Sequence, residues 1–201
     1  MKSNSELQFG DSVMFRNVLK NPEIFKGILE IVLNEDINKI KHAGGQNNED
    51  IYCTPNDEKI NIYVNEYSRS VYSTGILQKD DGSIPKRTRY YQAINELAFS
   101  QSCNGNYSCD KNYVILFCRF DPFGYGLQEY VFRNMCNEDS GLQLGDNATT
   151  IILNTTGEEG PASDRLTELL GYIEHPEKIP EKPLYRNIEN EVTKARKKSK
   201  N

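Results

Sequence analysis

The stretch Tyr113-Val-Ile-Leu-Phe-Cys-Arg-Phe120 decides the fold class of this chain. It is almost entirely apolar, which is typical of a central strand that is covered on both faces. Before it come an alternating strand pattern over 60–64, a second strand pattern over 71–77 and a helix pattern from Pro85 to about residue 99. The sequence therefore predicts an α/β (α+β) protein in which helices flank a central sheet.

Further elements are expected on both sides of this region. Asp11 is predicted to cap a first helix, and Asn21-Pro22-Glu23 to start a second one, because a cap, a proline and an acid follow one another there. Two more strands are expected over 128–133 and 149–153. Asp164 is then predicted to cap a helix with a regular apolar face.

The chain changes character after this helix. Pro176, Pro180 and Pro183 predict a stiff linker, and a polar helix rich in lysine and arginine follows them. We therefore expect one domain over residues 1–174 and, over 175–201, a proline-containing linker with a basic C-terminal helix or tail.

Composition limits the classes of function. The 201 residues carry a net charge of -5, so nucleic-acid binding would need a local basic patch. No segment approaches the ~18 apolar residues of a membrane span. Residues 1–10 also lack the apolar core of a signal peptide, which predicts a cytoplasmic chain without a membrane partner. The five cysteines are irregularly spaced, and free thiols are expected rather than a zinc site or a Cys103–Cys109 disulfide.

Several segments, in their order along the chain, resemble the PD-(D/E)XK nuclease family transposases (Rpn, recombination-promoting nuclease-like). The sharpest match is Pro85-Lys-Arg-Thr-Arg-Tyr-Tyr-Gln92. The others are Asp11-Ser-Val-Met-Phe15, Asn21-Pro-Glu23, Ile28-Leu-Glu-Ile-Val-Leu33, the stretch 113–124, Glu129-Tyr-Val-Phe132, Leu144-Gly-Asp146, Ile151-Ile-Leu-Asn154 and Leu169-Leu-Gly-Tyr-Ile173. The resemblance covers nearly the whole chain and implies a restriction-endonuclease-like fold, with a mixed central sheet flanked by helices.

The resemblance also implies where a reaction site would lie. In the family, the hairpin before the segment that matches Pro85–Gln92 carries Leu-Asp-Val-Tyr on its first strand and Glu-Met-Gln on its second. The Asp and Glu hold Mg²⁺, a cation that usually needs one or two carboxylates and that stabilises charge on the scissile phosphate. Aligned without gaps, this chain has Asn61 at the Asp, Gly75 at the Glu and Leu77 at the Gln. We therefore expect a degenerate site without a metal cofactor.

A working enzyme remains an alternative. A second register places Asp50 at the Asp and Tyr63-Val-Asn65 at Glu-x-Gln, which restores one carboxylate. Asp50 or Glu66, together with Glu30 from the second helix, would then form a relocated set that binds Mg²⁺. The alternative for Glu30 is an ordinary residue on the helix surface.

The helix that begins at Pro85 carries the candidate nucleic-acid contacts Lys86, Arg87, Arg89 and Tyr91. These residues either face a phosphate or form a solvated basic face beside a core tyrosine.

The sequence leaves three hypotheses for the function of the chain. The first is a catalytically degenerate nuclease-fold protein that binds DNA, forms a homodimer or regulates an intact relative. The second is an active Mg²⁺-dependent DNA endonuclease. The third is a protein-interaction module without DNA binding.

Overall fold

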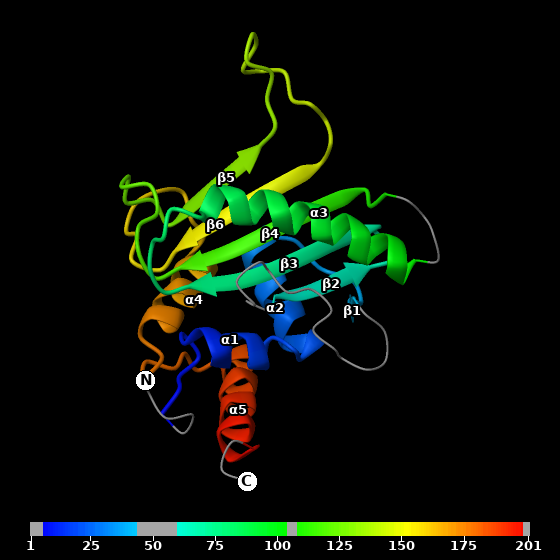
Figure 1. Cartoon of the computed structure of the whole chain (residues 1–201). Coiled ribbons are helices and arrows are strands. Elements are labelled where there is room, and N and C mark those ends of the chain that lie inside the picture. The colour runs from blue at the N-terminus through cyan, green and yellow to red at the C-terminus, as the bar shows by residue number, and fades with distance from the viewer. Residues whose placement is uncertain (1–5, 44–59, 104–107, 199–201) are drawn as a thin grey trace.

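The computed structural model describes residues 6–43, 60–103 and 108–198. Within these residues the centre is a six-stranded mixed sheet with the order β1-β2-β3-β4-β6-β5 (Figure 1). The strands are β1 (Lys41–His42), β2 (Asn61–Asn65), β3 (Ser70–Leu77), β4 (Lys111–Cys118), β5 (Glu129–Arg133) and β6 (Ala148–Asn154). Strands β3, β4 and β6 run parallel to one another, while β1–β2, β2–β3 and β5–β6 pair antiparallel.

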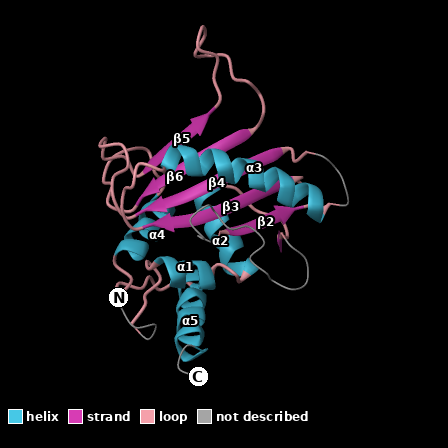
Figure 2. Ribbon diagram, viewed as in Figure 1, coloured by secondary structure: helices cyan, strands magenta, loops and turns pink. Residues whose placement is uncertain are grey.

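Helices cover both faces of this sheet (Figure 2). They are α1 (Ser12–Val18), α2 (Pro22–Leu33), α3 (Ile84–Ser102), α4 (Asp164–Glu174) and α5 (Pro183–Lys198). One hydrophobic cluster joins one face of the sheet to α1, α2, α4 and α5, and a second cluster joins the opposite face to α3. The predicted mixed α/β class is therefore confirmed, with a sheet flanked by helices.

Strand β4 explains this arrangement. Ile115 and Phe117 pack in the cluster with α1, whereas Val114 and Leu116 pack in the cluster with α3. Because side chains alternate along a strand, an apolar run of this kind must be buried on both faces. The prediction made from this stretch is confirmed.

The helix starts follow local rules. Asn21 accepts a hydrogen bond from the Glu23 backbone N–H (3.1 Å), with Pro22 as the first residue of α2, as expected. The predicted cap of α4 is wrong by one position. Ser163 is the cap and accepts from the Leu166 N–H (3.2 Å), so Asp164 is the first helical residue. Either residue type can cap a helix, so the sequence did not distinguish them.

The sequence predicted a proline-containing linker and a basic C-terminal helix or tail over 175–201, and in the structure the helix α5 packs on the core. Tyr185, Ile188 and Val192 of α5 are buried in the cluster with α1, α2 and α4. Arg196 Nε also donates to the backbone oxygen of Leu7 (2.8 Å). The spacing of these three apolar residues is that of an amphipathic helix, so the signal was present within a polar sequence.

Two further observations concern the described residues. No helix among them is long and apolar enough to cross a membrane. Cys103, Cys109, Cys118 and Cys136 are free thiols, as expected, and Cys53 lies outside the described residues.

Candidate functional site

A pocket of about 210 Å³ lies between α1, the end of β3 and α3, close to the start of β2. Its polar lining comes from Ser12 and Arg16 of α1, Thr74 of β3 and Tyr91 of α3, and the remaining lining is apolar side chains and glycine. None of the described residues in this lining carries a carboxylate. Because the pocket borders the strand ends where the sequence placed the vestigial site, it is the first candidate site.

The β2–β3 ladder fixes which side chains can meet there. Asn61 pairs with Thr74, so alternate residues of β3 share the face of Asn61. Asn61 Nδ2 donates to the backbone oxygen of Arg16 (3.0 Å), which places this face against α1. Two positions beyond Thr74, Ile76 packs in the same cluster as α1. Asn61, Thr74 and Ile76 therefore form one row under α1.

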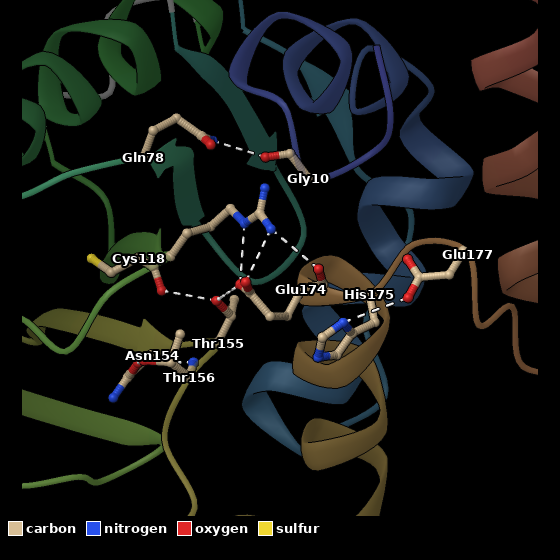
Figure 3. A network of polar contacts seen from close by, with 10 residues as sticks. Gly10, Gln78, Cys118, Asn154, Thr155, Thr156, Glu174, His175 and Glu177 are labelled. Carbon is tan, nitrogen blue, oxygen red and sulfur yellow. Dashed lines mark hydrogen bonds and ion pairs between the residues drawn. The ribbon is translucent and has the colours of Figure 1, made fainter. Parts of the chain in front are cut away.

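Gln78, directly after β3, extends the row. Its Nε2 donates to the backbone oxygen of Gly10 (2.8 Å), just before α1, and Figure 3 shows the two groups facing each other. Gly10 must approach its neighbours closely, because a Cβ there would lie 2.4 Å from the Ile173 backbone oxygen. The close packing of this segment holds the Gln78 contact in place.

The predicted positions Gly75 and Leu77 face the other side of the sheet from Asn61. A Cβ on Gly75 would contact Leu116 and Ile60, and these residues, like Leu77, belong to the cluster with α3. The structure therefore does not bring Asn61, Gly75 and Leu77 onto one face. The ungapped alignment relied on the spacing to Pro85, and a slip of one residue reverses every side chain of a strand.

A shift by one residue restores a common face. Ile76-Leu77-Gln78 then lies over Glu-Met-Gln, with Ile76 at the Glu and Gln78 at the Gln. Sequence reasoning missed Gln78, although the glutamine was visible and only the alternation of the strand was needed to find it. With this register the row keeps the amides of Asn61 and Gln78 and lacks both carboxylates.

These side chains do not fit Mg²⁺. Asn61 offers one neutral oxygen, Ile76 offers no ligand atom and Gln78 carries no charge, whereas Mg²⁺ usually needs one or two carboxylates. Among the described residues, no group of three or more His, Cys, Asp or Glu side chains could hold a metal ion.

The alternative carboxylates are elsewhere. Glu30 Oε1 accepts from the Ile37 N–H (3.2 Å) and lies 3.5 Å from Lys26 Nζ, so it holds the chain that follows α2. Glu66 follows the last residue of β2, about 16 Å along the strand from Asn61, and forms an ion pair with Lys41. Neither lines the pocket, and Asp50 lies outside the described residues.

The predicted nucleic-acid contacts of α3 divide into two pairs. Lys86 and Arg89 are exposed. Arg87 Nη2 lies 2.9 Å from Asp81 Oδ2, and Tyr91 is buried and lines the pocket. Burial raises the pKa of the Tyr91 hydroxyl. Of these four residues, Lys86 and Arg89 are the pair accessible at the surface. Arg87 and Tyr91 are four positions apart and therefore share the inner side of the helix.

Buried polar atoms without partners lie in the pocket lining and on Asn61, which pairs with the lining residue Thr74. Asn61 Oδ1, Thr74 Oγ1 and Arg16 Nε are all buried, and none has a hydrogen-bond partner in the described part of the chain. An unpaired buried polar atom is costly, so a cluster of three is unusual for a purely structural position. The cluster is neutral apart from the positive guanidinium of Arg16.

A second polar cluster lies at the carboxyl ends of β4 and β6 (Figure 3). Arg119 Nε and Nη2 donate to the two oxygens of the Glu174 carboxylate (3.1 and 3.0 Å), and Thr155 Oγ1 donates to Glu174 Oε2 (2.6 Å). Hydrogen bonding to Arg119 lowers the pKa of Glu174. This cluster ties the end of α4 to the sheet. Sequence reasoning missed it, since the polar residues after β4 and β6 carried no motif.

Comparisons of the chain with protein-family models, with curated proteins and with solved structures find no match. The family resemblance and its chemistry therefore stay predictions.

Proposed function

We propose that this chain is a nuclease-fold protein of the PD-(D/E)XK transposase type that binds nucleic acid without cleaving it. One observation carries the proposal. On the face where the resemblance implies an Asp and a Glu, the chain has Asn61 and Ile76, while Gln78 matches the family Gln. The antiparallel β2–β3 hairpin, followed by α3 and a parallel β4, is compatible with the implied fold.

The loss of cleavage follows from the loss of charge. Two carboxylates would hold the metal that stabilises negative charge on a scissile phosphate. Two neutral side chains at the same positions leave the described lining of the pocket without an anionic group. The lining instead contains the Arg16 guanidinium and the hydroxyls of Ser12, Thr74 and Tyr91.

This lining suits an anion such as a phosphodiester. Arginine presents several N–H donors to phosphate oxygens, and hydroxyl groups add further donors. Lys86 and Arg89, exposed near the start of α3, supply positive charge on the same helix that contributes Tyr91. Because the whole chain carries a net charge of -5, binding must depend on these local groups and must weaken with salt.

A protein-interaction module is the second candidate. Twelve large hydrophobic side chains are exposed in the described part of the chain, and seven of them lie between residues 123 and 144. They are Phe123, Tyr125, Val131, Phe132, Met135, Leu142 and Leu144. A concentration of this kind marks a surface that contacts another protein. On this alternative the chain binds no DNA even at low salt.

The binding proposal is tested by the fluorescence anisotropy of a labelled DNA duplex at about 50 and 200 mM salt. We expect binding that weakens with salt, and about tenfold weaker binding for Arg16→Gln. The Asn61 contact is to the backbone of Arg16, so this change leaves it intact. Arg186→Gln, on the exposed side of α5, is the matched control and should bind as the unchanged chain does.

Two outcomes contradict the proposal. Absence of binding at the lower salt concentration would favour the interaction module. Cleavage of the duplex on addition of Mg²⁺ would favour the enzyme alternative.

The register is tested by rebuilding the carboxylates as a second arm of this experiment. Asn61→Asp with Ile76→Glu places both charges on the face of α1, whereas Asn61→Asp with Gly75→Glu places the second charge toward α3. Mn²⁺ or Mg²⁺ should raise the melting temperature of the first double variant only, since ~100-fold excess over Kd adds about 2.7 kcal/mol. Equal responses of the two variants would reject the register.

A further inference from the structure

Strand β5 forms an edge of the sheet and pairs with β6 alone among the described strands. The Asn154 N–H donates to the backbone oxygen of Gln128 (2.9 Å). This bond fixes which residues of β5 direct their backbone groups toward β6. The backbone groups of Tyr130 and Phe132 therefore point toward β6. The N–H and C=O groups of Glu129, Val131 and Arg133 point outward, away from the sheet.

This edge is suited to pairing with another strand. Val131 and Phe132 are 44% and 45% exposed, and β5 contains no proline or lysine, which commonly protect such edges. Phe132 also belongs to an aromatic group on the face of α3. The ring centroid of Phe123 lies 5.3 Å from that of Phe132 and 4.8 Å from that of Tyr130. An exposed strand with apolar side chains on both faces is a binding surface for a strand.

The order of residues in β5 is complementary to itself. The strand reads Glu129-Tyr130-Val131-Phe132-Arg133. In an antiparallel pair of two such strands centred on Val131, the outward backbone groups meet each other. Glu129 then lies opposite Arg133 of the second copy, and Tyr130 lies opposite Phe132 of the second copy. Opposite charges and aromatic pairs directly across two strands are both favourable.

We propose that two copies of this chain pair through β5, antiparallel and with Val131 on the twofold axis, so that their two sheets become one. The interface is isologous, since each copy contributes the same strand. This proposal does not depend on nucleic-acid binding, and strand β5 contributes no residue to the described lining of the pocket.

The two charged residues support this arrangement. Glu129 is half-buried, and burial raises the pKa of its carboxyl group. Neither Glu129 nor Arg133 has an ion-pair partner in the described part of the chain, and they are about 13 Å apart along the strand. They therefore do not pair within one copy. The dimer gives each of them a partner of opposite charge.

A five-residue strand alone buries too little surface, because stable interfaces bury about 1,200–2,000 Å² in total. The segment between β5 and β6 adds contact area. It continues the hairpin beyond the sheet, with a bridge between Met135 and Gln143, and it projects away from the body in Figure 1. The same register brings Met135 beside Leu127 of the second copy, near the exposed Tyr125.

A second copy explains the edge better than an unrelated partner. An unrelated strand would need apolar side chains but no particular order of charge. The strand has an acid at one end and a base at the other, placed symmetrically about its central residue. This symmetry has a physical consequence only when the strand meets its own copy.

The experiment measures self-association of the full chain by sedimentation equilibrium, with circular dichroism melts to verify folding. The unchanged chain should dimerise at micromolar concentrations. Glu129→Arg alone, or Arg133→Glu alone, places like charges opposite each other twice per dimer. Each should weaken self-association by at least about tenfold.

Two controls separate this geometry from a general loss of stability. The double variant Glu129→Arg/Arg133→Glu restores opposite charges and should dimerise as the unchanged chain does. An equimolar mixture of the two single variants should form a heterodimer, because one strand then carries two positive charges and the other two negative charges.

Three results would overturn the proposal. They are a monomeric unchanged chain at tens of micromolar, single variants that dimerise normally, and a mixture of folded single variants that stays monomeric.

Discussion

Two polar clusters under the same face of the sheet are built in opposite ways. In the cluster at the ends of β4 and β6, the Glu174 carboxylate receives hydrogen bonds from Arg119 and from Thr155. In the cluster at the pocket, Asn61 Oδ1 and Thr74 Oγ1 are buried and have no hydrogen-bond partner among the described residues. Burial alone therefore does not distinguish these clusters, whereas the pairing of their polar atoms does.

The difference separates a structural role from a functional one. Paired charges hold α4 against the sheet and contribute to stability. Unpaired buried groups cost free energy, and such positions are retained most readily where they contact a ligand. The comparison predicts that removing a polar group destabilises the protein in the first cluster and stabilises it in the second.

The largest expected effect is that of Arg119→Met. Among the described residues, the change leaves the Thr155 hydroxyl as the remaining side-chain donor to the Glu174 carboxylate, in a place where both charged side chains are 23% exposed. Breaking a partly buried ion pair should lower the free energy of unfolding by about 3 kcal/mol, measured by urea denaturation. Arg186→Met, at an exposed position of α5, should change it by less than about 0.5 kcal/mol. Equal effects of the two variants would show that the pair contributes nothing specific.

The next effect is the pH dependence of the same cluster. The pKa of Glu174 is lowered in the folded state, chiefly by hydrogen bonding to Arg119. Its contribution is therefore complete above the ordinary carboxyl pKa and disappears as the pH falls through the lowered folded-state value. Glu174→Gln should cost about 2 kcal/mol at neutral pH, and this cost should shrink in acid. A cost that stays constant from neutral pH to acid would rule out the carboxylate as its source.

The fold was more predictable than the site. The apolar run of β4 specified a strand covered on both faces, and Asn21-Pro22-Glu23 specified a helix start, because each depends on residues close in sequence. The burial of α5 was missed. Its three buried residues have the spacing of an amphipathic helix, but they lie in a strongly charged sequence, which is typical of a solvated tail.

The candidate site depended on strand pairing, which sequence alone fixes poorly. Asn61 was placed at the start of the correct strand, but the ungapped alignment grouped it with Gly75 and Leu77, which face the other side of the sheet, and the residues that share its face are Thr74 and Ile76. One residue of register determines which face a side chain occupies. Arg87 and Glu30 both make contacts within the chain, Arg87 with Asp81 and Glu30 with Lys26 and the Ile37 N–H.

The smallest effect gives the sharpest test of the comparison between the clusters. Thr74→Val removes a buried hydroxyl that has no partner in the described residues, and it keeps the volume of the side chain. It should raise the free energy of unfolding by about 1 kcal/mol. Thr88→Val is the matched control, because the Thr88 hydroxyl donates to the Pro85 backbone oxygen (3.2 Å), and this change should lower the free energy by about 1 kcal/mol. If both variants shift the urea midpoint in the same direction, the Thr74 hydroxyl is paired in solution. If they shift it in opposite directions, the pocket retains a polar group at a cost in stability, and a ligand for that group is the reason to retain it.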